Sequence, residues 1–413
     1  MAHLLMVESF LEGNAKILPN LLKKLGHSYT FVTRNKNIYP KDEELNDHNV
    51  IKCADSIIET DTNSIKEILN AIRNQKLDGI ITTCDYYIET VQKLSEQLNI
   101  PCPFPRKVDN VRYKHNLRKI LDEAKLWNPK YEIACNWNEV LDASRKIGFP
   151  LVLKPVDLSS SAYVRLIRNA EELRDAFDLL ESFPINWRDQ KRNCIYLLEE
   201  YMVGDEISVE AITFQGNTEI IGITEKSLTG EPYFIENGHM FPADLTEKRK
   251  KEISEYVVKA LHAAEYDHGI SHTEVKLTKD GPRIIEINPR VAGDYIAELI
   301  NLVCGVEILR AFIDLSLGEK PIFSLKKTDK VSTSIMFLTP KQGGRILKIE
   351  GKDVLKTNPN VVFYQIADCD GMWMETPVDN VGRLGRIIVK DVQGYNAMKF
   401  ARELMSQLEV KFE

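Results

Sequence analysis

A pair of glutamates separated by eleven residues lies on what the sequence predicts to be a β-hairpin. Residues 270–278 and 282–288 have strand-like patterns, and the segment around Asp280 between them (Lys-Asp-Gly) is typical of a hairpin turn. If the turn centres on Asp280, the strand register places Glu274 opposite Glu286. Two like charges that face each other destabilise a sheet unless something compensates them.

The residues around Glu286 indicate what could compensate the two charges. Side chains alternate along a strand, so we expect Glu286 and Asn288 on one face and Ile285 and Ile287 in an apolar layer on the other. Two carboxylates and an amide oxygen suit a hard divalent cation such as Mg²⁺. Arg290 follows closely, where it can meet a phosphate or a carboxylate. The alternative is a solvated acidic hairpin without a ligand.

This segment has the pattern E-x(11)-E-I-N-P-R and resembles the metal-binding hairpin of the ATP-grasp superfamily. The resemblance implies ATP as the bound nucleotide and Glu274, Glu286 and Asn288 as ligands of Mg²⁺, with a pair of ions expected and Mn²⁺ as a possible substitute. It also implies that Arg290 stabilises an acyl phosphate and its tetrahedral adduct during catalysis.

The composition is that of an ordinary globular protein. The chain has 413 residues, of which 43% are hydrophobic and 28% are charged, enough for several domains and a large core. The formal net charge of -7 argues against a nucleic-acid partner, and no apolar run reaches membrane-spanning length. Seven scattered cysteines without C-x-x-C, and a start without signal-peptide features, lead us to expect a reduced, cytoplasmic protein.

The N-terminal part of the chain alternates strand and helix patterns, which favours a parallel, Rossmann-like sheet. The motif G-x-G-x-x-G is absent, so a dehydrogenase is the weakest alternative. The expected strands are 3–7, 29–33 and 79–83, and the expected helices are 18–25, 65–73 and 88–98.

Two acidic residues follow the last of these strands. Open α/β sheets bind ligands at the carboxyl ends of their strands, so Asp85 and Glu89 are candidate substrate contacts. Asp85 also suits the N-cap of the next helix, and this is the role we expect for it.

A proline-rich segment at residues 101–105 marks a domain boundary. A basic amphipathic helix is predicted at 113–121. A basic helix face is commonly just solvated. A K-x-x-x-R-x-x-L helix lies at this place in ATP-grasp enzymes, however, and the resemblance implies that Lys114 reaches the nucleotide phosphates.

A lysine is predicted at the end of a buried strand, residues 150–154. Burial of the ammonium of Lys154 is costly unless an anion lies beside it. The F-P-x-V-x-K-P pattern here resembles the phosphate-binding strand of the family. The loop that follows has Ser159, Ser160 and Ser161 where most relatives have glycines. Hydroxyl and backbone N–H groups can still hold phosphate oxygens, although a glycine-free loop is stiffer.

Residues 195–211 resemble the family segment that joins the two lobes around ATP. Its backbone is implied to face the adenine, and Glu206 has the spacing of the glutamate that binds the ribose hydroxyls. By itself, Glu206 has the less favoured alternative of an exposed strand charge. A further strand is expected at 220–226. The residues that the resemblance assigns to ATP binding here are Glu199, Glu200, Tyr201, Glu206 and Lys226.

A segment without periodicity, 227–245, is expected to be a loop that carries specificity. Its pattern of Glu236, His239 and Pro242 resembles the E-x-G-H-x-x-P signature of ATP-grasp ligases that join amino acids. Glu236 can pair with the ammonium of an amino acid, and His239 can hydrogen-bond the carboxylate or act as a base. Both could instead be ordinary loop residues that satisfy each other or the backbone.

The predicted class is α/β with an ATP-grasp fold, in which two α+β lobes clasp ATP. Helices are expected at 246–266 and 296–317, short strands at 331–338, 343–345 and 382–390, and a closing helix of about two dozen residues. The expected domains are a Rossmann-like pre-ATP-grasp domain at 1–105, an ATP-grasp domain at 106–321 with a lid at about 135–205, and a small C-terminal α+β subdomain at 322–413.

The resemblance covers nearly the whole chain, and its nearest branch is that of the L-amino-acid ligases, which make dipeptides or related amides. It implies that a carboxylate attacks the γ-phosphate of ATP to give an acyl phosphate and ADP, and that an amine then forms the amide and releases phosphate. The expected partners are small molecules, with a homodimer as an option. Two alternatives remain: a carboxylase or carbamoyl-type enzyme that uses bicarbonate, and a non-catalytic nucleotide-binding regulator, which has no need of both carboxylates.

Overall fold

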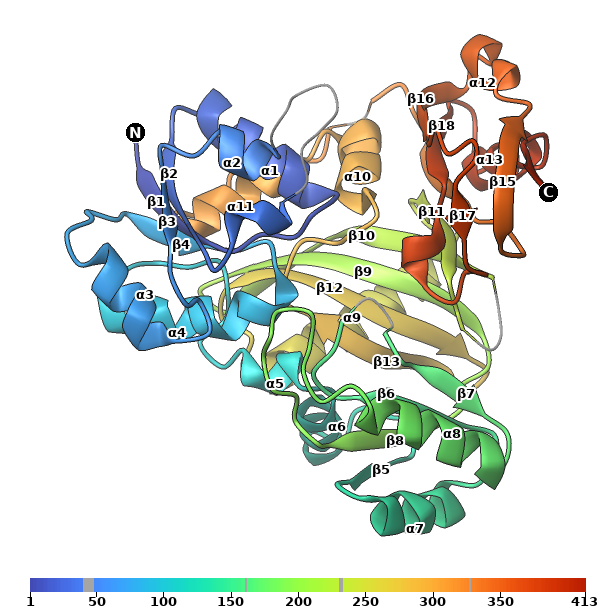
Figure 1. Cartoon of the computed structure of the whole chain (residues 1–413), viewed down its shortest axis with the longest axis horizontal. Helices are drawn as coiled ribbons and strands as arrows, with labels where there is room; N and C mark the ends of the chain where they lie inside the picture. Colours follow the sequence, from blue (N-terminus) through green and yellow to red (C-terminus); the bar gives the residue numbers. More distant parts are fainter. Residues whose placement is uncertain (40–47, 160–161, 230–232, 327) are drawn as a thin grey trace.

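The computed structural model describes residues 1–39, 48–159, 162–229, 233–326 and 328–413. In this part of the chain, three smaller β-sheets are arranged around a long central sheet (Figure 1). The N-terminal sheet lies at its upper left, a small sheet with two helices lies below it, and the C-terminal strands lie at its right (Figure 1). None of the described helices is long and apolar enough to cross a membrane.

The N-terminal sheet is parallel, with strand order β3-β2-β1-β4, as the alternating pattern predicts. Helices pack on it, so residues such as Leu5, Phe31 and Ile80 are fully buried. Its strands are β1 (His3–Val7), β2 (Ser28–Thr33), β3 (Ser56–Glu59) and β4 (Gly79–Ile81). Its helices are α1 (Asn14–Lys24), η1 (Lys36–Ile38), α2 (Asn49–Lys52), α3 (Ile65–Ile72), η2 (Asp85–Tyr87) and α4 (Ile88–Leu98).

The central sheet is antiparallel and has eight strands in the order β13-β12-β9-β10-β11-β14-β18-β16. Its first five strands by chain position are β9 (Asp205–Phe214), β10 (Asn217–Leu228), β11 (Glu236–Phe241), β12 (Gly269–Thr278) and β13 (Gly281–Asn288). Val275 and Ile287 pack with Val257 of α9 (Glu247–Ala263), so the charged residues that alternate with them face the other side.

Short helices connect the N-terminal sheet and the central sheet, both before the first strands of the central sheet and after β13 in the sequence. The helices α5 (Asp109–Arg112) and α6 (Lys114–Glu123) precede the central sheet, and α6 packs on β13 and α9. The predicted helical region at 296–317 forms α10 (Ile296–Cys304) and α11 (Ile308–Ser316). The helix α11 packs against α1 and β4, so the chain returns to the N-terminal sheet after it has built the central one.

The small sheet below the central one has the order β5-β8-β6-β7, and we refer to it with its helices as the lid. Asn136 and Asn169 begin the two lid helices by accepting a hydrogen bond from the backbone N–H three residues later, where a glutamate stands in each case. The lid strands are β5 (Tyr131–Ala134), β6 (Leu151–Pro155), β7 (Arg165–Ile167) and β8 (Tyr196–Glu200). Its helices are α7 (Trp137–Ile147) and α8 (Ala170–Glu181).

The C-terminal part extends the central sheet and adds a second small sheet, β17-β15-β19. The strands that extend the central sheet are β14 (Ser332–Leu338), β16 (Val361–Ile366) and β18 (Gly385–Asp391). The remaining elements are β15 (Gly344–Glu350), α12 (Asp353–Thr357), β17 (Trp373–Met374), η3 (Asn380–Gly382), α13 (Ala397–Met405) and β19 (Glu409–Phe412).

The prediction of a long closing helix is wrong. Helix α13 spans only nine residues, and the chain then turns into β19, which pairs with β15. The apolar spacing within α13 extends by chance into Val410 and Phe412, which pack in the same C-terminal core. The partner strand lies far away in the sequence, so local periodicity could not reveal it.

The prediction that 227–245 is a loop is also wrong for part of that segment. Strand β11 lies between β10 and β14 and pairs with both. Four consecutive residues of this strand, 238–241, are buried, so the strand lacks the polar alternation by which a half-exposed strand is recognised. Residues 230–232 lie outside the described part of the chain.

The hairpin formed by β12 and β13 has the predicted pairing of Glu274 with Glu286, but a bulge lies between the turn and that pair. Thr278 pairs with Gly281 at the turn, and the register shifts beyond Val275, so that Ile285 has no partner on β12. Ile285 therefore lines a cleft rather than the apolar layer, and the expectation that it faces the core is wrong.

Candidate active site

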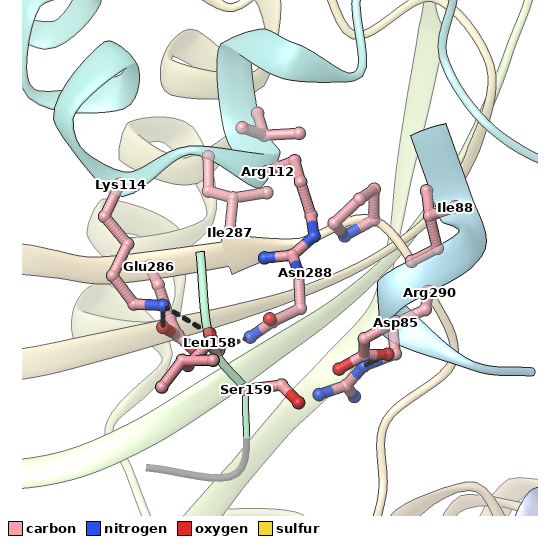
Figure 2. A pocket seen from close by; sticks show the side chains of 12 residues that line it. Asp85, Ile88, Arg112, Lys114, Leu158, Ser159, Glu286, Ile287, Asn288 and Arg290 are labelled. Carbon is pink, nitrogen blue, oxygen red and sulfur yellow. Dashed lines mark hydrogen bonds and ion pairs between the residues drawn. The ribbon is translucent and has the colours of Figure 1, made fainter. Parts of the chain in front are cut away.

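Two adjoining cavities lie along the β12–β13 hairpin. The larger, with about 860 Å³ of open space, lies between the lid sheet and the charged face of the central sheet. The smaller, with about 320 Å³, lies between the end of β13 and the N-terminal sheet (Figure 2). Lys114, Leu158, Ser159 and Glu286 line both cavities, so the two are parts of one site.

Part of the lining of the larger cleft is apolar. Val152 of β6, Met202, Leu228 and the bulged Ile285 line it together with Tyr201. This composition suits a flat, weakly polar ring held between the two sheets. Tyr201 and Glu200 thus lie where the resemblance expects the adenine, and that role stays a prediction.

The lysine predicted at the end of a buried strand has its counter-charge within the chain. The Nζ of Lys154 lies 2.6 Å from Glu199 Oε2, and the Nε of Arg118 lies 2.5 Å from Glu199 Oε1. Burial alone would raise the pKa of Glu199, but the two cations hold it at about 2. Arg118 also donates to the carbonyls of Ile284 and Ile285, so this ion triad ties the lid, α6 and the hairpin bulge together.

Lys226 lies among three glutamates. Its Nζ is 2.7 Å from Glu236 Oε1 and 2.9 Å from both Glu206 Oε1 and Glu274 Oε1. Burial alone would lower the pKa of Lys226, but these carboxylates raise it well above its usual range. Lys276 Nζ also lies 3.1 Å from Glu206 Oε2. With all groups ionised, the carboxylates outnumber the lysines, so the cluster retains negative charge for a cationic ligand.

Glu286 and Asn288 share one face of β13, as predicted. Asn288 Nδ2 donates to Glu286 Oε1 at 2.7 Å, and Lys114 Nζ lies 3.0 Å from Glu286 Oε2. Figure 2 shows Lys114 beside this carboxylate and Asn288 next to it. Within the described part of the chain the Asn288 amide oxygen has no hydrogen-bond donor, so it can serve as a ligand.

Glu274 has a polar contact with His272, a residue that the sequence analysis did not single out. His272 Nε2 lies 3.3 Å from Glu274 Oε1, and its Nδ1 lies 2.8 Å from Glu210 Oε1. Burial alone would lower the pKa of His272, but Glu210 and Glu274 raise it to about 9. Lys226 and His272 both engage Oε1, and among the described residues no hydrogen bond or ion pair involves Oε2. The donor set of Glu274, Glu286 and Asn288 therefore fits a divalent cation.

Arg290 and Asp85 form an ion pair in the smaller cavity, with 2.8 Å between Arg290 Nε and Asp85 Oδ1 (Figure 2). The expectation that Asp85 caps the next helix is wrong, because Tyr87 stands at the N-cap of α4 and Asp85 pairs with Arg290 instead. Glu89 accepts a hydrogen bond from the Tyr113 hydroxyl at 2.7 Å and is not among the residues found to line either cavity.

Glu236 and His239 lie on a strand, and they bind other residues rather than each other. His239 is buried and its Nε2 lies 3.2 Å from Asp294 Oδ2. Glu236 Oε2 accepts from Asn380 Nδ2 at 3.0 Å. Sequence reasoning missed Asp294, Asn380 and Arg383 of this cluster. The position of Asp294 just after Arg290 was a usable signal, whereas the other two lie far along the chain.

The serine loop is described only in part. Ser159 lines both cavities, next to Lys114 and Leu158. Ser160 and Ser161 lie outside the described residues, so their expected contact with phosphate stays a prediction.

A cleft between two α+β units, floored by paired hairpin carboxylates and lined by lysines, defines the ATP-grasp fold. Family models match the chain at three places: an ATP-grasp N-terminal domain at residues 23–102, an ATP-grasp domain at 147–298 and an L-amino acid ligase C-terminal domain 2 at 336–413. The chain therefore contains ATP-grasp domains, as the resemblance predicts, and these identify it as an ATP-grasp ligase. The predicted fold class is thereby confirmed.

Individual proteins agree with this placement. The crystal structure of an L-amino acid ligase from Bacillus licheniformis shares the fold, with a TM-score of 0.83 and 21% identity over 100% of this chain and 99% of that one. Alanine–anticapsin ligase of Bacillus subtilis is 27% identical over 61% of this chain, and carnosine synthase 1 of Gallus gallus is 24% identical over 69%. The chain spans 56% and 32% of the lengths of these two relatives.

Proposed function

We propose that the protein is an ATP-dependent ligase that joins the carboxylate of an amino acid to an amine, through an acyl phosphate and with release of ADP and phosphate. The observation that carries the proposal is the pairing of Glu274 with Glu286, beside Asn288, on the floor of a cleft lined by Lys114 and Lys154. Paired carboxylates that face a cluster of cations are what an enzyme needs to hold a metal and a polyphosphate together.

The nucleotide occupies the larger cleft in this proposal. The adenine lies against the apolar lining residues near Tyr201, and Glu206 takes the ribose hydroxyls. Lys114, Lys154 and Ser159 hold phosphate oxygens, because ammonium and hydroxyl groups are suitable donors to them. Lys154 is pre-oriented for this by its ion pair with buried Glu199.

The metal ligands are Glu274, Glu286 and Asn288. A Mg²⁺ ion held by these residues would supply positive charge that offsets the charge of the phosphates and so makes the γ-phosphate easier to attack. Lys226 shares the carboxylate of Glu274 with this site. Lys226 also lines the larger cleft, and we assign it to the charges that balance the phosphates.

The acyl-transfer step belongs to the smaller cavity. Arg290 offers a planar fork of donors to the substrate carboxylate and then to the acyl phosphate, and Asp85 orients that fork. Glu236 lines the larger cleft and provides a carboxylate for the substrate ammonium. His239 is proposed as a hydrogen-bond partner or base, and its burial against Asp294 favours a supporting role.

The test is an assay of purified protein with ATP, Mg²⁺ and pairs of amino acids. We expect ADP and phosphate to form only when a carboxylate and an amine are both supplied, with an amide as the second product. AMP and pyrophosphate as products would exclude the acyl-phosphate route. ADP formation that needs bicarbonate but no amino acid would favour the carboxylase alternative, and nucleotide binding without turnover would favour a regulator.

A further inference from the structure

The C-terminal part of the chain reaches the active site through Arg383, which lies two residues before β18. Its NH1 lies 2.8 Å from Asp294 Oδ1 and its NH2 lies 2.9 Å from Asp294 Oδ2, which is the bidentate geometry of a strong ion pair. The same NH2 donates to the backbone carbonyl of Glu236 at 2.7 Å. One guanidinium thus joins the start of β11 to the loop that follows β13.

A second residue from the same segment, Asn380, also forms hydrogen bonds with Glu236. Asn380 Nδ2 donates to Glu236 Oε2 at 3.0 Å, and the backbone N–H of Glu236 donates to Asn380 Oδ1 at 3.0 Å. The backbone and the carboxylate of Glu236 are therefore both held by residues 380–383. Lys226 engages the other carboxylate oxygen, so the orientation of this side chain is fully determined.

The backbone conformation at Asp294 explains why the loop after β13 needs contacts that stabilise it. Asp294 and Tyr295 have φ values of 51° and 62°, a left-handed conformation that non-glycine residues seldom adopt. Arg383 holds the first of them, and Arg386 stacks over the ring of the second at 4.2 Å. Arg290 lies on the same loop, so the C-terminal part stabilises the loop that carries the reactive-site arginine.

A metal ion is the competing explanation for this cluster. The ligand atoms of Glu236, His239 and Asp294 lie within 4.8 Å of one another, close enough for a shared ion. Arg383 already occupies both oxygens of Asp294, and Lys226 pairs with Glu236. Asp294 therefore has no oxygen free for a metal, whereas the Glu236 side chain is 17% exposed and faces the larger cleft, where a substrate ammonium can reach it.

We infer that Arg383 is a positioning residue that holds Glu236 and the loop 289–295 in the arrangement that receives the amino-acid substrate. The inference rests on the proposed function, in which Glu236 binds the substrate ammonium. The C-terminal part of the chain then contributes to substrate selection and not only to stability, because the donors that orient Glu236 come from it.

The test compares Arg383→Ala and Arg383→Lys with Arg345→Ala, a control whose exposed arginine lies in the same part of the chain. We expect Arg383→Ala to raise the KM for the amino acid about tenfold or more, because a partly buried bidentate pair is lost, while the KM for ATP changes little. Arg383→Lys should recover only part of the loss, since an ammonium lacks the planar fork. Arg345→Ala should behave as wild type.

Two further measurements identify the route of the effect. In a double-mutant cycle, Asp294→Asn should add little to Arg383→Ala, because both changes remove the same contact. Amide hydrogen exchange should become faster at 289–295 and around Glu236 in Arg383→Ala, and this readout needs no activity.

The outcomes separate the inference from the proposed function. If the wild type is active and Arg383→Ala has an unchanged KM for the amino acid, the inference is overturned and the proposed ligase function stands. Unchanged exchange at 289–295 would overturn it even if no substrate pair is found. A wild type that never forms ADP with any amino acid would refute the proposed function and, with it, the substrate role inferred for Arg383.

Discussion

The side chains that line the cleft carry more charge than a protein interior accepts without partners. Glu199 is balanced by Arg118 and Lys154, whereas Lys226 faces three carboxylates. The unbalanced negative charge therefore lies on the side of the cleft where Glu274 stands. A divalent cation would restore the balance there, which is why the metal ligands are the most informative residues to change.

Glu286→Gln keeps the size of the side chain and removes one ligand charge. We expect turnover to fall by about 10²-fold or more, because a developing charge loses its stabilisation, while the fold is retained. The measurement is Mg²⁺-dependent ADP formation, with circular dichroism as the check on folding. Glu219→Gln, at an exposed glutamate of β10 on the same sheet, is the matched control. Normal Mg²⁺-dependent turnover in Glu286→Gln would end the metal-site interpretation.

Glu199 provides a pH-dependent contribution to stability. Its pKa is lowered from 4.5 to about 2, so the folded protein gains stability above the unfolded-state value and loses it as the pH falls from about 4.5 towards 2. That loss is of the order of 3 kcal/mol. We expect Glu199→Gln to lower the free energy of unfolding at neutral pH by a similar amount, about 3 kcal/mol, since two buried cations lose their partner.

Urea unfolding at several pH values measures this effect. The wild type should lose stability more steeply than Glu199→Gln as the pH falls from about 4.5 towards 2, because only the wild type has this carboxylate to protonate. Parallel curves for the two proteins would contradict the assignment of that pH dependence to Glu199.

At the scale of elements, the lid touches the N-terminal sheet through a short turn at residues 185–191. Arg188 NH2 donates to the carbonyl of Ser9 at 2.7 Å, and its NH1 lies 3.9 Å from the buried carboxylate of Glu8. Asp189 pairs with Arg34 at 2.8 Å. The turn thus connects the lid to the residues that directly follow β1 and β2.

Arg188→Ala should loosen the lid. Glu8 loses a cationic neighbour and the lid loses its hydrogen bond to Ser9, so we expect the KM for ATP to rise severalfold and amide exchange at 184–192 to become faster. Lys191→Ala, at an exposed lysine of the same turn, is the control. If exchange and KM were the same in both variants, the turn would not restrain the lid.

At the scale of the whole molecule, the cleft joins the N-terminal sheet, the lid and the central sheet, and the C-terminal strands continue the central sheet through β14. A ligand in the cleft therefore contacts units that are separate in sequence. The domain boundaries expected at 105/106 and 321/322 stay predictions, and the second of them falls before strands that share one sheet with β11.

Nucleotide binding should stabilise the whole chain. A ligand that binds only the folded state at about 100 times its Kd adds roughly 2.7 kcal/mol to the free energy of unfolding. We expect MgATP to raise the Tm of the wild type, and ATP with a chelator to raise it less. In Glu286→Gln the dependence on Mg²⁺ should be lost. An equal shift with and without Mg²⁺ in the wild type would place the metal outside this cleft.

Local patterns were sufficient for much of the fold and for the main ligands. The period of the N-terminal strands, the turn at Asp280 and the buried strand before Lys154 each depend on a few neighbouring residues, and the structure has these elements where the sequence predicts them. The pairing of Glu274 with Glu286 was predictable for the same reason, since a hairpin is a local structure.

What the sequence by itself determined was therefore which residues carry charge, where strands and helices alternate, and which carboxylates face each other across one tight turn. Only the tertiary structure decided that Arg118 and Glu199 hold Lys154, that Asp85 pairs with Arg290, and that residues 380–383 return to Glu236. It also decided that β11 is a central strand and β19 an edge strand. These contacts join residues far apart in the chain, and their energies depend on burial and on the charges brought together by folding, which no local spacing encodes.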